Sequence, residues 1–317
     1  MAVYTDLTDE ELRDLLAAYD LGGALAFKGI AEGVENSNFL LEVEKGRFFL
    51  TIFEKRVARA DLPFFMGVME ALALKRFPAP RPIRTRDGAL LVEARGKPAA
   101  IVTFLNGVSP KRPNPAQCRA LGETLARMHE ALEGVKLERP NALGPDAWAP
   151  LITPRLKDAD AMEPGLAAAI ESDLAALKDW PSGLPEGVIH ADLFPDNALF
   201  LGDALTGVID FYFACTDALA YDLGVCLNAW CFTGRDYLMT NAKNLIAGYQ
   251  SVRALSPAEL EALPTLARGA AMRFFATRLA DWSATPAGAL VRPKDPLEYA
   301  EKLAFHRKAK SAADYGA

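Results

Sequence analysis

The stretch that decides the fold is His190-Ala-Asp-Leu-Phe-Pro-Asp-Asn197, followed by Gly207-Val-Ile-Asp-Phe211. It contains one histidine, an aspartate two residues later (Asp192), Asn197, and a second aspartate at Asp210. Apolar runs too short for helices flank these polar residues and predict short strands, at 187–189, 198–201 and 207–209. Loops at the ends of strands are where a rigid scaffold presents reactive groups. Residues 190–210 are therefore the candidate site.

The three oxygen-bearing side chains of this stretch suit one kind of chemistry. A carboxylate such as Asp192 can accept the proton of a substrate hydroxyl. The amide oxygen of Asn197 and the carboxylate of Asp210 suit a hard cation such as Mg²⁺. A base and metal ligands are what phosphoryl transfer requires. The alternative is that these residues only cap turns, but their order, spacing and strand context favour a functional role.

The first hundred residues predict an antiparallel sheet with one inserted helix. Thr8 and Glu11 form a capping-box pattern that opens a helix over about 8–20. Two runs of strand-forming residues, Asn38–Val43 and Arg47–Phe53, enclose a turn and predict a hairpin. A helix over 61–77, which three prolines end, and two further strands at 89–93 and 98–105 complete this part.

The remainder of the chain has a different, mainly helical pattern. Asn114-Pro115 places a cap residue before a proline and predicts a helix through about Leu132. Another helix is expected near 164–180, and nearly everything after Asp217 has helical periodicity. The expected class is α+β with two lobes. A small β-rich lobe spans residues 1–105 and a larger helical, catalytic lobe spans residues 106–317, with a hinge near Phe104–Gly107.

Composition limits the classes of partner. The 317-residue chain carries a net charge of −6, which argues against a broad nucleic-acid-binding surface. Its first residues are acidic and helix-like and do not resemble a signal peptide. No uninterrupted apolar stretch is long enough to span a bilayer. The four cysteines show no metal-binding spacing. We expect a cytoplasmic protein that binds neither nucleic acid nor membrane, while its oligomeric state stays open.

The motif at 190–210 resembles the catalytic and metal-binding loops of the aminoglycoside phosphotransferase and choline kinase superfamily, relatives of the protein kinases. The resemblance implies a bilobal protein-kinase-like fold with ATP between the lobes. It implies that Asp192 is the catalytic base and that His190 organises its loop. It also implies that Asn197 and Asp210 hold Mg²⁺. Asp222 lies in an apolar stretch, where an ionised group needs partners, so it is expected to brace the His190 loop.

The nucleotide side is less specific. Glycines and small polar residues before the hairpin, including Gly33, Asn36 and Asn38, could let backbone N–H groups approach phosphates, although a plain loop fits equally well. The resemblance places the adenine against backbone groups of Phe104 and Leu105. Thr51 occupies the strand position where related kinases carry a phosphate-binding lysine. Other cations could replace that lysine, namely Lys28, Lys55 or Arg56.

Within this superfamily the chain resembles homoserine kinases most, through the Asn36-Ser-Asn38 pattern, the run Phe49–Glu54 and the last long helix. The resemblance implies L-homoserine as substrate. Arg273 and Arg278 on that helix lie among apolar residues and each needs an anion, which predicts that one of them binds the substrate carboxylate. The alternatives are kinases for choline, aminoglycosides or fructosamines, and a nucleotide-binding pseudokinase.

Overall fold

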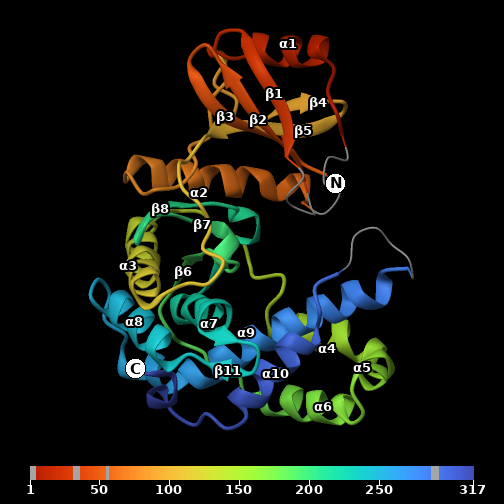
Figure 1. Cartoon of the computed structure of the whole chain (residues 1–317), viewed down its shortest axis with the longest axis vertical. Helices are drawn as coiled ribbons and strands as arrows, with labels where there is room; N and C mark the ends of the chain where they lie inside the picture. The colour runs from red at the N-terminus through yellow and green to blue at the C-terminus, as the bar shows by residue number, and fades with distance from the viewer. Residues whose placement is uncertain (1–4, 31–35, 55–56, 287–292) are drawn as a thin grey trace.

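The computed structural model describes residues 5–30, 36–54, 57–286 and 293–317. Figure 1 shows a small lobe, built on an open sheet, joined to a larger and mostly helical lobe that carries the C-terminus. The small lobe here means the described residues up to Thr103, and the large lobe means those from Gly107 onward. Gly33, Lys55 and Arg56 lie outside the described residues.

The small lobe is a five-stranded antiparallel sheet of order β1-β2-β3-β5-β4. The predicted hairpin and helices are confirmed, with Thr8 and Glu11 forming the capping box of the first helix. The strand expected at 89–93 is shorter, and the first strand has no counterpart in the prediction. The elements are α1 (Asp9–Ala17), β1 (Ala24–Ile30), β2 (Ser37–Val43), β3 (Gly46–Ile52), α2 (Leu62–Leu74), β4 (Val92–Ala94) and β5 (Lys97–Thr103).

The two faces of this sheet pack into different cores. Alternate residues of a strand point to opposite faces. On β5, Ala99 and Ile101 join a core with α1, whereas Ala100 and Val102 join the core that contains α2 and the large lobe. Helix α2 thus lies between the sheet and the large lobe (Figure 1).

The large lobe surrounds a short irregular β region with helices. The predicted helix at Asn114 and the three predicted short strands are confirmed. Its elements are α3 (Pro115–Ala131), α4 (Pro145–Ile152), α5 (Leu156–Met162), α6 (Leu166–Ala176), β6 (Glu186–Ile189), β7 (Ala198–Leu201), β8 (Ala204–Val208), β9 (Cys215–Ala218), α7 (Leu219–Trp230), β10 (Phe232–Thr233), β11 (Asp236–Tyr237), α8 (Met239–Gln250), α9 (Pro257–Ala284) and α10 (Leu297–His306).

The connector between the lobes is attached closely to the large lobe. Val108 exchanges two backbone hydrogen bonds of 2.9 Å with Phe200, and Thr206 Oγ1 donates to the carbonyl of Asn106 (2.6 Å). Gly107 has a φ of +145°, and a Cβ there would overlap Thr206 and Leu199. Glycine is therefore required at this point. The predicted lobe boundary after residue 105 falls inside this connector.

None of the helices in the described ranges has both the length and the apolar character needed to cross a bilayer.

Candidate active site

One buried carboxylate, that of Asp222, holds the loop that follows β6. Asp222, on α7 and fully buried, accepts the backbone N–H groups of His190 (2.8 Å) and Ala191 (2.9 Å). Ala191 has a φ of +62°, a left-handed conformation that costs a non-glycine residue about 1–2 kcal/mol. The two hydrogen bonds to Asp222 hold the chain in this turn.

The tautomer of His190 follows from its two contacts. Asp192 N–H donates to Nδ1 (3.2 Å), so Nδ1 carries no proton and Nε2–H donates to the carbonyl of Ile209 (3.0 Å). Burial lowers the pKa of this imidazole, in agreement with a neutral ring. Neutral His190 therefore ties the Asp192 loop to Ile209, the residue just before Asp210.

A chain of hydrogen bonds supports Asp222 from behind. Arg253 has only donors and donates to the hydroxyl of Tyr249 (3.1 Å). The Tyr249 O–H must then donate to His129 Nδ1 (2.8 Å), and His129 Nε2–H donates to Asp222 (3.2 Å). Burial alone would raise the pKa of Asp222, but the bonds from His129 and the loop amides hold it below its usual value.

Two glycines bring the helices that carry this chain together. Gly122 on α3 and Gly248 on α8 face the other helix, and a Cβ on either would overlap its backbone. The close contact between α3 and α8 places His129 and Tyr249 within hydrogen-bonding distance.

Asp192 belongs to the loop that Asp222 holds, and it lies beside Asn197. The amide nitrogen of Asn197 donates to the backbone carbonyl of Asp192 (2.7 Å) and approaches its carboxylate (3.3 Å). Burial raises the pKa of Asp192 to about 7, the charge of Asp210 adds to this rise, and the charges of Arg273 and Lys294 oppose it. Asp192 is thus a carboxylate poised to take a proton near neutral pH.

The donor set around Asp192 fits Mg²⁺. Because Asn197 uses its nitrogen toward Asp192, its oxygen is left as the ligand atom. Asp210 adopts a left-handed backbone with φ +65°, a conformation that turns the chain sharply after β8. Only oxygen donors are involved, and Mg²⁺ typically takes one or two protein oxygens together with substrate phosphates.

Arg273 is buried next to the loop that carries Ala191 and Asp192. Its side chain is on α9, the residue is 2% exposed, and Nη1 donates to the carbonyl of Ala191. The guanidinium lies 4.4 Å from the ring centroid of Phe274 and 5.4 Å from that of Phe213. Its Nε is buried without a hydrogen-bond partner among the described residues. The hydrogen bond of Arg273 is thus with the loop, and its ring contacts are with Phe213 and Phe274.

Arg278 has an anion within the protein. It pairs with Glu298 (2.6 Å) and donates to the carbonyl of Asp295 (2.9 Å), over the ring of Tyr299 (4.5 Å). The sequence predicted that Arg273 or Arg278 would find its anion in the substrate carboxylate. The structure supplies Glu298 instead, twenty residues along the chain at the start of α10.

Lys294, which the sequence did not single out, lies on the Asp192 side of the site. Its ammonium is 5.4 Å from the ring centroid of Phe194, two residues from Asp192, and the side chain belongs to an exposed residue. No local pattern in the sequence marks this lysine, because its proximity to Asp192 depends on how α9 and α10 pack.

Three of the predicted nucleotide-side residues, Asn36, Asn38 and Thr51, each make a side-chain hydrogen bond in the small lobe. Asn36 accepts the backbone N–H of Glu54 (3.2 Å), and Thr51 donates to the side chain of Asn38 (2.8 Å). Edge-to-face contact between Phe53 and Tyr212 (5.2 Å) brings the end of β3 to the Asp210 loop. Glu70, on α2, pairs with Arg84 (2.8 Å).

The hinge residues are packed on both sides. Phe104 stacks on Phe49, with ring centroids 5.3 Å apart, and Leu105 packs against Gly207, where a Cβ would lie 2.9 Å from the leucine. These contacts place the connector between the sheet and the β7–β8 hairpin.

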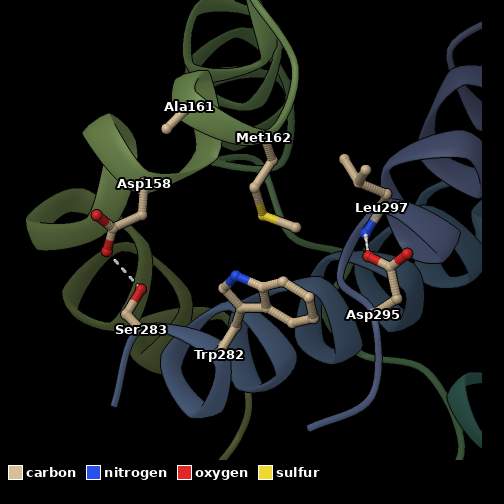
Figure 2. Close-up of a pocket in the computed structure, with 7 residues that line it drawn as sticks. All are labelled: Asp158, Ala161, Met162, Trp282, Ser283, Asp295 and Leu297. Atoms are coloured by element: carbon tan, nitrogen blue, oxygen red, sulfur yellow. Dashed lines mark hydrogen bonds between the residues drawn. The ribbon is translucent and has the colours of Figure 1, made fainter. Parts of the chain in front are cut away.

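A separate cavity of about 560 Å³ opens between α5, the end of α9 and the start of α10. Figure 2 shows the Trp282 ring below Met162, with Asp158 on one side and Asp295 on the other. Asp158 accepts a hydrogen bond from Ser283, and Asp295 accepts one from the backbone of Leu297 (2.9 Å). The charged residues that line this cavity are both acidic.

Comparison with known proteins agrees with this geometry. Residues 26–255 match the phosphotransferase enzyme family. The chain is 58% identical to a homoserine kinase of Hyphomonas neptunium, with all of both chains covered. It is 59% identical to a homoserine kinase of Caulobacter vibrioides, with 97% of this chain and 98% of the other covered.

Solved structures with the same fold are more distant in sequence. An amicoumacin kinase superposes with a TM-score of 0.68 at 16% identity and covers 95% of this chain and 92% of its own. A choline kinase from Cryptosporidium parvum gives 0.62 at 14% identity, covering 89% and 88%. The fold is therefore protein-kinase-like, and the chain belongs to the phosphotransferase enzyme family, within the group of its homoserine kinases.

Proposed function

We propose that this protein transfers the γ-phosphoryl group of ATP to the hydroxyl of L-homoserine, giving O-phospho-L-homoserine for threonine synthesis in the cytoplasm. The full-length relatives named homoserine kinase support this choice of acceptor. The observation that carries the chemistry is the Asp192 carboxylate, which lies beside Asn197 on a loop that buried Asp222 holds in place.

The reaction needs a base at the acceptor hydroxyl. Asp192 accepts the hydroxyl proton as the oxygen attacks the γ-phosphorus, and the bond to the leaving ADP oxygen breaks. Asn197, through its oxygen, and Asp210 would hold Mg²⁺, which neutralises charge on the phosphates when it is bound. His190 and Asp222 keep the loop in the geometry that points Asp192 at the acceptor.

ATP would lie between the lobes. Backbone groups of Phe104 and Leu105 would meet the adenine, and the segment with Gly33, Asn36 and Asn38 would cover the phosphates beside Thr51. The close packing of the connector supports this assignment, as do two hydrogen bonds, one from Thr51 to Asn38 and one from the Glu54 backbone to Asn36, because they hold the nucleotide side in place.

The predicted contacts of Arg273 and Arg278 with the substrate carboxylate remain to be tested. Both guanidiniums already have protein partners, and the two residues are 2% and 8% exposed. If either binds the carboxylate, its replacement by lysine should raise KM for homoserine and leave KM for ATP unchanged, because lysine lacks the bidentate fork.

An ATP-consumption assay across acceptors tests the function directly. L-Homoserine, choline, ethanolamine, a fructosamine and an aminoglycoside are compared at equal concentration, with Asp192→Asn as the blank. We expect homoserine to give the highest kcat/KM. A higher kcat/KM for another alcohol would identify that alcohol, and not homoserine, as the acceptor. Loss of ATP turnover with every acceptor would favour the nucleotide-binding pseudokinase.

A further inference from the structure

The carboxylate of L-homoserine requires a cation close to Asp192. The hydroxyl oxygen and the carboxylate carbon are separated by three carbon atoms, so bond lengths near 1.5 Å keep them within about 5 Å of each other. When the hydroxyl lies at Asp192, the carboxylate must lie a short distance away. A cation that binds it has to be near Asp192 and open to the substrate.

Among the described residues, two cations contact neighbours of Asp192 in the same loop: Arg273 through the Ala191 carbonyl, and Lys294 through the ring of Phe194, 5.4 Å from its ammonium. Arg273 is 2% exposed and is already bonded to the Ala191 carbonyl beneath the loop. Lys294 is exposed and lies over the ring of Phe194, whose backbone N–H donates to the carbonyl of Asp192 (2.8 Å). Of these two, Lys294 is the one that a ligand can reach.

Two further cations of this region, within the described part of the chain, are already paired. Arg278 and Lys302 both pair with Glu298, each at 2.6 Å. The cavity of Figure 2 cannot supply the cation either, because its charged lining residues are Asp158 and Asp295, which would repel a carboxylate.

We propose that Lys294 binds the carboxylate of L-homoserine and thereby selects an amino acid over an amino alcohol. This inference rests on the proposed function. A lysine suits the task, because its flexible stem carries a compact charge that can follow the substrate into the site. The competing role for Lys294 is contact with the transferring phosphoryl group, in place of the lysine that is missing at Thr51.

The experiment compares two acceptors that differ in the carboxylate alone. 3-Amino-1-propanol is homoserine without its carboxylate. For Lys294→Met we expect kcat/KM with homoserine to fall about 10- to 100-fold, the range for one hydrogen bond to a charged group. Turnover of 3-amino-1-propanol should change little. Lys294→Arg keeps the charge and should restore most of the preference for homoserine.

Lys308→Met is the matched control. Lys308 is also exposed, but it lies beyond the C-terminal end of α10, whereas Lys294 lies before the N-terminal end. An unchanged ratio of the two acceptors in Lys294→Met would overturn the proposal. An equal loss with both acceptors would also overturn it and would assign Lys294 to the phosphoryl group. Failure of the wild type to phosphorylate homoserine would instead refute the proposed function.

A second measurement does not depend on turnover of the amino alcohol. L-2-Aminobutyrate keeps the carboxylate and the amino group but has no hydroxyl, so it should compete with homoserine without being phosphorylated. Its inhibition constant should rise about tenfold or more in Lys294→Met and stay unchanged in Lys308→Met. Equal inhibition constants for wild type and Lys294→Met would contradict the assignment.

Discussion

Two carboxylates, one in each lobe, differ in how well they are partnered. In the small lobe Glu54 accepts hydrogen bonds from Thr5 (2.7 Å), Ser37 (2.8 Å) and Lys97. Burial alone would raise the pKa of Glu54, but these partners hold it below its usual value. Asp192 receives one long side-chain contact among the described residues, from Asn197 at 3.3 Å, and burial raises its pKa to about 7. A carboxylate with full partners stabilises the fold, and one with few remains available to a substrate.

The largest effect that we expect is the loss of turnover when the Asp192 carboxylate is replaced. Asp192→Asn should lower kcat by about 10²–10⁴-fold, because the amide cannot accept the hydroxyl proton. Glu54→Gln is the control and should leave kcat near the wild-type value. Steady-state kinetics with homoserine measure both, and circular dichroism checks the fold. A comparable loss of kcat in the two variants would remove the distinction between the carboxylates.

Removal of a predicted metal ligand should have the next largest effect. Asn197→Ala and Asp210→Ala should each raise the Mg²⁺ concentration for half-maximal activity by about tenfold or more and lower kcat, because each removes an oxygen ligand. Titration of Mg²⁺ at saturating ATP and homoserine gives this value. Wild-type Mg²⁺ dependence in both variants would show that neither residue holds the metal.

The two carboxylates should also affect stability with opposite sign. Asp192 has a folded-state pKa of about 7, above its ordinary 3.8. The unfolded state therefore gives up this proton first, and the free energy of unfolding falls between about pH 4 and pH 7 and stays low above pH 7. Asp192→Asn should therefore be more stable than wild type at pH 8 and equal to it near pH 4. Glu54 has a lowered pKa, so its contribution is present above its ordinary pKa and is lost on acidification.

Urea unfolding of the ligand-free protein at several pH values measures this contrast. Glu54→Gln should lose roughly 1–3 kcal/mol of unfolding free energy at pH 7, the range for removing one partner of a buried hydrogen bond. The loss should shrink below about pH 4. Difference curves of the same sign for the two variants would contradict the comparison.

The smallest effect concerns the support behind Asp222. Tyr249→Phe removes the O–H that donates to His129 Nδ1, so the donor chain that ends at Asp222 is interrupted. We expect a loss of about 0.5–1.5 kcal/mol in unfolding free energy and a decrease in kcat below about tenfold. Tyr237→Phe, which loses a hydrogen bond to the Tyr315 carbonyl (3.2 Å), is the control. A similar decrease in kcat there would make the effect nonspecific.

The parts of the site that depend on local spacing could be predicted from the sequence. Asp192 and Asn197 interact across a five-residue loop, and His190 reaches Ile209 because two short strands lie between them. The sheet and the main helices follow from periodicity and capping for the same reason.

Contacts that depend on tertiary packing could not be predicted. Arg278 was expected to need an external anion, but its partner Glu298 lies on another helix. His129 reaches Asp222 across 93 residues. Strand β1 was not predicted. Most of its residues are exposed, so its sequence lacks the alternation of apolar and polar residues that marks a half-buried strand.

The tight attachment of the connector has a mechanical consequence. Residues from Asn106 to Val108 are bonded to the β7–β8 hairpin, and β5 ends at Thr103 within the sheet. Rotation of the small lobe relative to the large lobe would therefore bend the chain at Phe104 and Leu105, and it would also break the hydrogen bond from Val208 N–H to the Pro78 carbonyl (2.8 Å). Phe104 and Leu105 are the residues proposed to meet the adenine, so the nucleotide would sit on the pivot itself. Bound ATP would then determine the angle between the two lobes.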